Sequence, residues 1–143
     1  MDEIVIPFEN DAEFLDMVNE HYANDNFAFK QCGIKINAAT PGQSFLSMEL
    51  DTHLANADGG VHGGAIYAFA DFAAAVADCD KYERNMTVDG SIQYLGLARG
   101  FNLYAHATRI KRGSTIAFYN VSIYDDVDTP VANAVFTFMH HPA

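Results

Sequence analysis

A single acidic residue interrupts the most apolar stretch of the sequence. Asp71 lies in the segment 62–78, where its neighbours are alanine, phenylalanine and tyrosine, and no Lys or Arg lies within a helical turn or two. A carboxylate removed from water is costly unless it is paired. A group so poorly placed for stability is a candidate functional residue. The alternative is a helix edge open to water, or a hydrogen bond from a neighbouring strand without a chemical role.

The glycine-rich start of the same segment is the second chemical feature. It reads Gly59-Gly60-Val61-His62-Gly63-Gly64 and leads into a pattern that predicts a helix over 62–78. The first amides of a helix have no intrahelical acceptor and lie at the positive end of its dipole. Glycines let a ligand approach them, so the amides could stabilise a carbonyl oxygen that acquires negative charge. Ordinary turn chemistry is the alternative reading of these glycines.

The spacing of these two features predicts a dimer. Asp71 follows Gly63 by eight residues, which is roughly 12 Å along a helix axis. A base or nucleophile and an oxyanion donor must both lie about 3 Å from one reacting group. Two antiparallel copies of the helix could bring Gly63 of one chain to Asp71 of the other, so a catalytic site requires a homodimer with two shared sites. We expect such dimers to pair into a homotetramer.

The surrounding pattern predicts the elements that hold this helix. Asn10, followed by Glu13, predicts the start of an amphipathic helix at about 11–22. A hairpin follows, with strands in 27–40 and 44–52, a possible bulge at Gly33 and a turn at Pro41-Gly42. Four strands then form a meander joined by short turns, at 86–95, 101–111, 114–125 and 130–140. Since the helix at 62–78 is apolar on nearly every side, we expect it to be buried all round, inside a curved antiparallel sheet. The prediction is one α+β domain over residues 1–143.

Composition limits the partners. The 143 residues carry a formal net charge of −11, which opposes binding to nucleic acid. Cys32 and Cys79 have no spacing typical of a disulfide framework or a zinc site, and the histidines show no ligand spacing. We therefore predict no metal and no cofactor. The acidic N-terminus does not resemble a signal peptide, and no stretch is apolar enough for a membrane span, so we predict a cytoplasmic protein without a membrane partner.

The segment from Asn56 to Asp71 resembles the signature of hotdog-fold acyl-CoA thioesterases, in particular those of the phenylacetic-acid-pathway type. In that group an Asn precedes His-Gly-Gly by six positions, and an Asp follows within the central helix; Asn56, His62, Gly63 and Asp71 fall in register. The Gly33-Ile34 strand, the Pro41-Gly42 turn and the later strand SIQYL extend the resemblance over nearly the whole chain. The resemblance implies a hotdog fold and hydrolysis of an acyl-CoA substrate.

The resemblance also implies roles for individual residues. Asp71 would be the nucleophile or the general base, the Gly63 amide would hold the thioester oxygen, Asn56 would orient water or substrate, and His62 would support the helix start. A hydroxyl early in the following strand assists the carboxylate in relatives, and Thr87 is the nearest match, with Ser91 as a rival. Candidate substrate-binding residues are Gly64, Tyr67 and Phe72, and the aromatic side chains of Tyr67, Phe69 and Phe72 favour aryl or medium-chain acyl groups.

Three of the eight basic residues gather near one predicted turn. Arg109, Lys111 and Arg112 could hold the phosphates of CoA, which need local cations on so acidic a protein. A solvated turn is the alternative, and Arg99 is the next candidate for the phosphates.

Two other functions fit the same fold. The hydratases and dehydratases of acyl thioesters place a catalytic His in an Asp-x-Asn-x-x-His setting, for which Asp58 and His62 are one residue too close. The second is an acyl-CoA-binding protein without catalysis. Hydrolysis by the purified protein separates the thioesterase from both.

Overall fold

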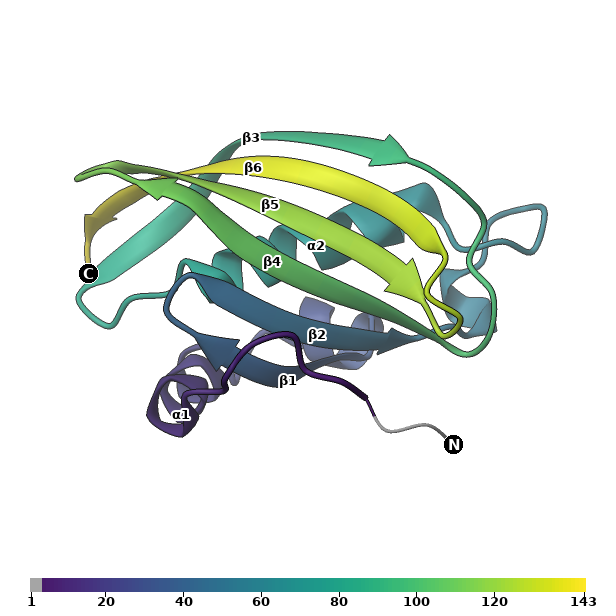
Figure 1. Cartoon of the computed structure of the whole chain (residues 1–143), viewed down its shortest axis with the longest axis horizontal. Helices are drawn as coiled ribbons and strands as arrows, with labels where there is room; N and C mark the ends of the chain where they lie inside the picture. Colours follow the sequence, from purple (N-terminus) through teal and green to yellow (C-terminus); the bar gives the residue numbers. More distant parts are fainter. Residues whose placement is uncertain (1–3) are drawn as a thin grey trace.

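The protein forms a curved antiparallel sheet around one long helix. A computed structural model describes residues 4–143, so the first three residues of the acidic N-terminal segment lie outside the described range. The elements follow the predicted order of helix, two strands, long helix and four strands (Figure 1). They are α1 (Ala12–His21), η1 (Phe27–Gln31), β1 (Ile34–Thr40), β2 (Gln43–Glu49), η2 (Thr52–Leu54), α2 (Gly63–Ala77), β3 (Glu83–Tyr94), β4 (Asn102–Arg112), β5 (Ile116–Asp125) and β6 (Pro130–Pro142). The α+β prediction is confirmed.

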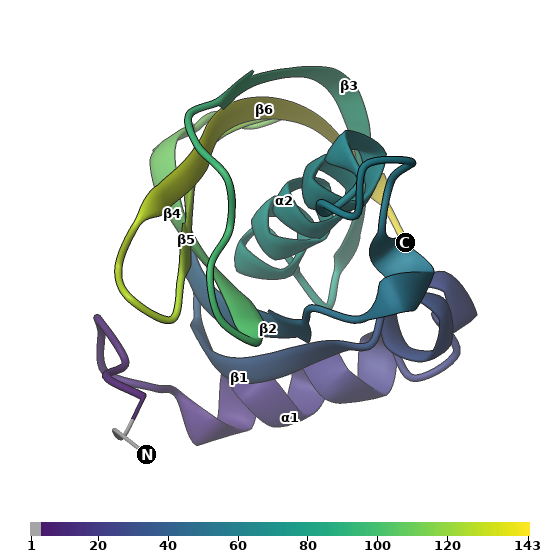
Figure 2. The ribbon, with the colours of Figure 1, turned by 90° about the vertical axis from the view of Figure 1, so that its right-hand side faces the viewer.

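The sheet order is β1-β2-β4-β5-β6-β3, and Figure 2 shows the strands as an arc around α2. The predicted meander is correct for β4, β5 and β6 but wrong for β3, which pairs with β6 at the edge. Residues 95–101 do not form a tight turn between neighbours. They cross the end of the sheet, where Leu95 N–H donates to Val131 O and Arg99 N–H donates to the Asp125 carboxylate.

The predicted hairpin of β1 and β2 is confirmed, with its turn at Pro41-Gly42. Gly42 has a φ of 87°, which only glycine adopts easily. The predicted bulge is misplaced. The register shifts between Ile36 and Ala38, whereas Gly33 lies between η1 and β1.

Two further predictions near the N-terminus are wrong. Asp11, not Asn10, caps α1 by accepting from Phe14 N–H, while the Asn10 side chain accepts from Ala39 N–H in β1. The predicted strand at 27–31 is the single helical turn η1, because the Asp25 side chain accepts from Ala28 N–H and starts the turn. This turn brings aromatic side chains toward α2.

Helix α2 is buried against the sheet on most of its surface but not all round. Its fully buried side includes Phe69, Ala73 and Val76, all at 0% exposure. Asp71 and several alanines are only half-buried, on a strip that faces the two unpaired sheet edges, β1 and β3. The curved sheet does not close on itself, so this strip stays accessible. Within residues 4–143, no helix is both long and apolar enough to cross a membrane.

Candidate active site

The Asp71 carboxylate lies on the accessible strip of α2 and faces β3. Its Oδ1 accepts a hydrogen bond of 2.7 Å from the Thr87 hydroxyl, and it forms no ion pair within residues 4–143. Burial raises the pKa of Asp71, and the hydrogen bond from Thr87 acts in the opposite direction. A carboxylate with a raised pKa and one hydroxyl partner is suited to accept a proton or attack an electrophile.

A bulge in β3 decides which hydroxyl reaches Asp71. The register of β3 against β6 shifts between Thr87 and Asp89, so Val88 is the extra residue. Strict alternation would put Thr87 and Ser91 on the same face of the strand. The bulge turns Ser91 outward, opposite the exposed Val135, and leaves Thr87 facing α2. Of the two rival hydroxyls, only Thr87 contacts Asp71.

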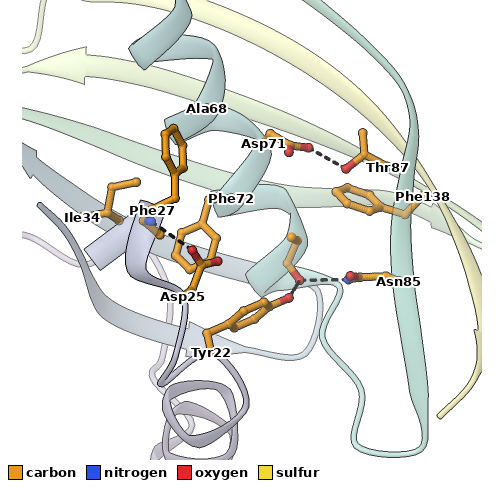
Figure 3. A pocket seen from close by; sticks show the side chains of 12 residues that line it. Tyr22, Asp25, Phe27, Ile34, Ala68, Asp71, Phe72, Asn85, Thr87 and Phe138 are labelled. Atoms are coloured by element: carbon orange, nitrogen blue, oxygen red, sulfur yellow. Dashed lines mark hydrogen bonds between the residues drawn. The ribbon is translucent and has the colours of Figure 1, made fainter. Parts of the chain in front are cut away.

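A cavity of about 230 Å³ adjoins the carboxylate (Figure 3). Asp71 and Thr87 lie at one end, and Tyr22, Asp25 and Asn85 lie at the other. The remaining lining is mostly apolar and comes from α2, η1, β1 and β6: Phe27, Ala28, Ile34, Ala68, Phe72, Ala75 and Phe138. Thus Phe72, a predicted substrate-binding residue, lines the cavity beside Asp71. Such a mostly apolar lining with a few polar groups is typical of small-molecule pockets.

Two predicted aromatic residues lie elsewhere. Phe69 is fully buried in the core. The Tyr67 ring packs against Phe136 and lies beneath Gly90, where any side chain would overlap with both rings. Burial raises the pKa of Tyr67, and nearby Asp71 contributes in the same direction. Neither ring lines the cavity of Asp71.

The start of α2 presents one free amide. His62 is the N-cap residue, and its Nδ1 accepts from Gly64 N–H at 3.0 Å. Within the described residues, the N–H of Gly63 has no hydrogen-bond acceptor. The Asn56 side-chain oxygen accepts from Asp58 N–H and Gly60 N–H, so it shapes the loop before the helix. Asn56 and His62 therefore order the backbone that carries Gly63.

A second, more open cavity of about 580 Å³ lies beside this helix start. Gly64 and His62 line it together with Lys30, His53 and Phe27, and Phe27 also lines the cavity of Asp71. The two cavities thus lie along one side of α2. Gly63 and Asp71 of one chain remain separated by roughly 12 Å of helix, so one chain does not bring them together.

Two of the three cations predicted to bind CoA phosphates are engaged within the chain. Arg109 Nε donates to the Tyr119 hydroxyl, and the Arg112 guanidinium forms ion pairs with Asp78 and Glu83. Of the three predicted cations, only Lys111 is exposed. Arg109 and Arg112 have partners within the chain, and binding of CoA phosphates stays a prediction.

Asp78, which sequence reasoning missed, is the centre of a buried polar cluster at the C-terminal end of α2. It is 1% exposed and accepts from Tyr119 Oη at 2.7 Å and Asn85 Nδ2 at 3.0 Å, and its carboxylate lies 2.8 Å from His140 Nε2. The acidic pair Asp78 and Asp80 at a helix end looks like a solvated surface in the sequence. Together with Arg112, these partners come from β3, β4, β5 and β6, so no local pattern signals the cluster. Residues 4–143 contain no group of three His, Cys, Asp or Glu side chains placed to hold a metal ion.

Comparison with protein families assigns the sequence to one family. The pattern that defines the thioesterase superfamily matches residues 58–132, which include the start of α2, Asp71 and Thr87. The chain belongs to the thioesterase superfamily. The matched range covers more than half of the sequence and contains the accessible strip of α2.

Solved structures show the same fold. The PaaI protein from the phenylacetic acid degradation operon of Escherichia coli is similar with a TM-score of 0.85 and 21% identity, over 92% of this chain and 95% of that chain. A thioesterase family protein from Silicibacter pomeroyi gives 0.82 and 21%, over 91% and 99%. A thioesterase from Haemophilus influenzae gives 0.79 and 21%, over 90% of both chains. The predicted hotdog fold of this superfamily member is confirmed.

Proposed function

We propose that this protein hydrolyses acyl-CoA thioesters to a free acid and CoA. Water supplies the oxygen of the new carboxylic acid, the C–S bond breaks, and the thiol leaves with a proton. The observation that carries the proposal is a half-buried carboxylate beside a cavity with aromatic walls in a thioesterase-superfamily chain. Within residues 4–143, Thr87 is the only hydrogen-bond partner of this carboxylate.

In this proposal Asp71 acts on water as a general base or attacks the thioester carbon itself. Both routes suit a carboxylate whose pKa is raised by burial. A single turnover in ¹⁸O-labelled water identifies attack by Asp71 when the label enters the enzyme. General-base catalysis puts the label into the product acid, whereas attack by Asp71 followed by hydrolysis at the Asp carbonyl puts it into the enzyme.

The thioester oxygen would be held by Gly63 N–H of a second chain, because the same chain's amide is too far from Asp71. The exposed edge of β3 supports such a dimer. It carries the apolar side chains of Met86, Val88 and Tyr94, each about half exposed. Unpaired edge strands with apolar side chains favour pairing with another strand. Pairing of these dimers into a tetramer remains part of the proposal.

The acyl group would occupy the cavity of Asp71. Its volume of about 230 Å³ and the rings of Phe27, Phe72 and Phe138 favour aryl or medium-chain groups over long chains. CoA phosphates would then lie outside this cavity. Lys111 is the exposed candidate, so Lys111→Ala should raise KM for acyl-CoA about threefold without raising it for a short thioester that lacks the nucleotide.

Release of free thiol from a panel of aliphatic and aromatic acyl-CoAs, with and without a chelator, tests the proposal. Asp71→Asn keeps the side-chain volume and removes the charge, so kcat should fall by about 10²- to 10⁴-fold. Because burial raises the pKa of Asp71, the ionised form destabilises the folded protein near neutral pH, and the variant should melt at a higher temperature. No thiol release from any substrate, or near-wild-type kcat in Asp71→Asn, would overturn the proposal.

The alternatives receive less support. No histidine lines the cavity of Asp71 in residues 4–143, and His62 Nδ1 is committed to Gly64 N–H, which disfavours a hydratase or dehydratase. A protein that only binds acyl-CoA would bind the same panel without releasing thiol.

A further inference from the structure

The peptide unit between Gly63 and Gly64 is held from both sides. The Tyr94 hydroxyl donates to Gly63 O at 2.7 Å, and Gly64 N–H donates to His62 Nδ1 at 3.0 Å. Because Nδ1 accepts this bond, neutral His62 carries its ring proton on Nε2. The result is a continuous chain of hydrogen bonds from Tyr94 through the peptide to His62.

Tyr94 reaches this position because of the bulge at Val88. Beyond the bulge, Gly90, Ile92 and Tyr94 pair with the buried residues of β6 and face α2. Strict alternation from Thr87 would turn Tyr94 to the outer face, which is why its contact with α2 is invisible in the sequence. The ring also lies against Gly63, where an added Cβ would meet it at an ordinary contact distance of 3.4 Å.

The position of this contact has a mechanical consequence. Two consecutive glycines form the first turn of α2, and glycine loses more conformational freedom on ordering than any other residue. Helix ends also fray. The free amide of Gly63 therefore sits on an intrinsically flexible turn, whereas an oxyanion donor must be preorganised to stabilise developing charge.

We propose that Tyr94 is a positioning residue that fixes the Gly63 amide for catalysis, an inference that rests on the proposed thioester hydrolysis. Tyr94 does not line either cavity, and it acts through the Gly63 carbonyl. Strand β3 thus contacts both catalytic groups of its own chain. Thr87 donates to the Asp71 carboxylate, and Tyr94 holds the turn that carries the Gly63 amide, which would act together with Asp71 of a second chain.

Tyr94→Phe tests this role because it removes one hydroxyl and keeps the ring. We expect kcat to fall about tenfold, the effect of one lost hydrogen bond, while KM changes less than about twofold. The matched control is Tyr82→Phe, because Tyr82 is 72% exposed and its ring lies near Lys81. Tyr82→Phe should leave kcat unchanged.

Two further measurements separate positioning from general stabilisation. In a Gly63→Pro background, which lacks the amide proton, Tyr94→Phe should cause no additional loss of kcat. Amide hydrogen exchange at Gly64 should be about tenfold faster in Tyr94→Phe than in wild type. An unchanged kcat, an equal loss of kcat in both backgrounds, or unchanged exchange at Gly64 would overturn the inference. If the wild type releases no thiol, the proposed function fails, whereas exchange at Gly64 still decides whether Tyr94 holds the turn.

Discussion

Replacing Gly63 by proline should remove the proposed oxyanion donor while keeping the helix. Gly63 is the first helical residue of α2, a position where proline is favoured because its missing N–H has no intrahelical acceptor. The preceding residue must be extended, and His62 already has φ −62° and ψ 129°. The added Cβ would meet the Tyr94 ring at 3.4 Å, an ordinary contact. The substitution therefore deletes a single donor with little strain.

Gly63→Pro should lower kcat because it removes a donor to the thioester oxygen. Removing one oxyanion-hole donor costs about 10²- to 10³-fold in kcat. Gly63→Ala adds the same Cβ but keeps the N–H, so it should lose less than about tenfold. Thiol release under saturating acyl-CoA measures both variants. Equal kcat values for Gly63→Pro and Gly63→Ala would show that this amide does not bind the thioester oxygen.

Mixing two inactive variants tests whether the site is shared. In a mixed dimer of Gly63→Pro and Asp71→Asn chains, one site holds both substitutions and the other holds none. With random pairing, half of the dimers are mixed, so coexpression should restore about a quarter of wild-type activity. A site within one chain predicts no recovery. Persistent inactivity of a coassembled mixture would refute the argument from the roughly 12 Å offset along α2.

Three further predictions concern Thr87, Phe72 and Arg112. Burial raises the pKa of Asp71, and the hydrogen bond from the Thr87 hydroxyl lowers it. Because Thr87→Val removes this bond, it should move the acidic limb of the kcat pH profile to higher pH. Phe72→Ala should shift the preference toward bulkier acyl groups, measured as the ratio of kcat/KM values, because this ring walls the cavity. Arg112→Ala should lower the free energy of unfolding by about 2 kcal/mol in denaturant titrations, because it leaves buried Asp78 with fewer partners.

Each of these predictions has a control in the chain. Ser91→Ala changes a hydroxyl on the outer face of β3 and should leave the pH profile in place. Phe118→Ala removes an exposed ring of β5, far from the accessible strip, and should not alter acyl preference. Lys111→Ala removes a neighbouring exposed cation and should leave stability unchanged. If a control variant changed the measured quantity as much as its test variant did, the corresponding prediction would be contradicted.

The sequence was most informative where one local pattern determined the outcome. The apolar run over 62–78 predicts α2 to within a residue or two, and the oddity of Asp71 within it points to the accessible strip. The turn at Pro41-Gly42 predicts the first hairpin for the same reason. These features depend on residues that are neighbours in the chain.

The sequence-based predictions fail where contacts between residues distant in the chain determine strand pairing and register. The place of β3 depends on pairing with β6, some fifty residues later, and turn chemistry at Arg99-Gly100 says nothing about that choice. The bulge at Val88 leaves no mark in the pattern, yet it selects Thr87 over Ser91. The choice between Thr87 and Ser91 therefore needed the register of the sheet.

The buried cluster around Asp78 has a consequence for how the protein unfolds. Its partners Arg112, Tyr119 and His140 lie 34, 41 and 62 residues away along the chain. Contacts between such distant residues carry a loop-closure cost, so we expect them to form after the rate-limiting step of folding. Interactions that are absent from the transition state slow unfolding without speeding folding. We therefore expect the cluster to slow the unfolding of the C-terminal end of α2 and to lengthen the lifetime of the native state.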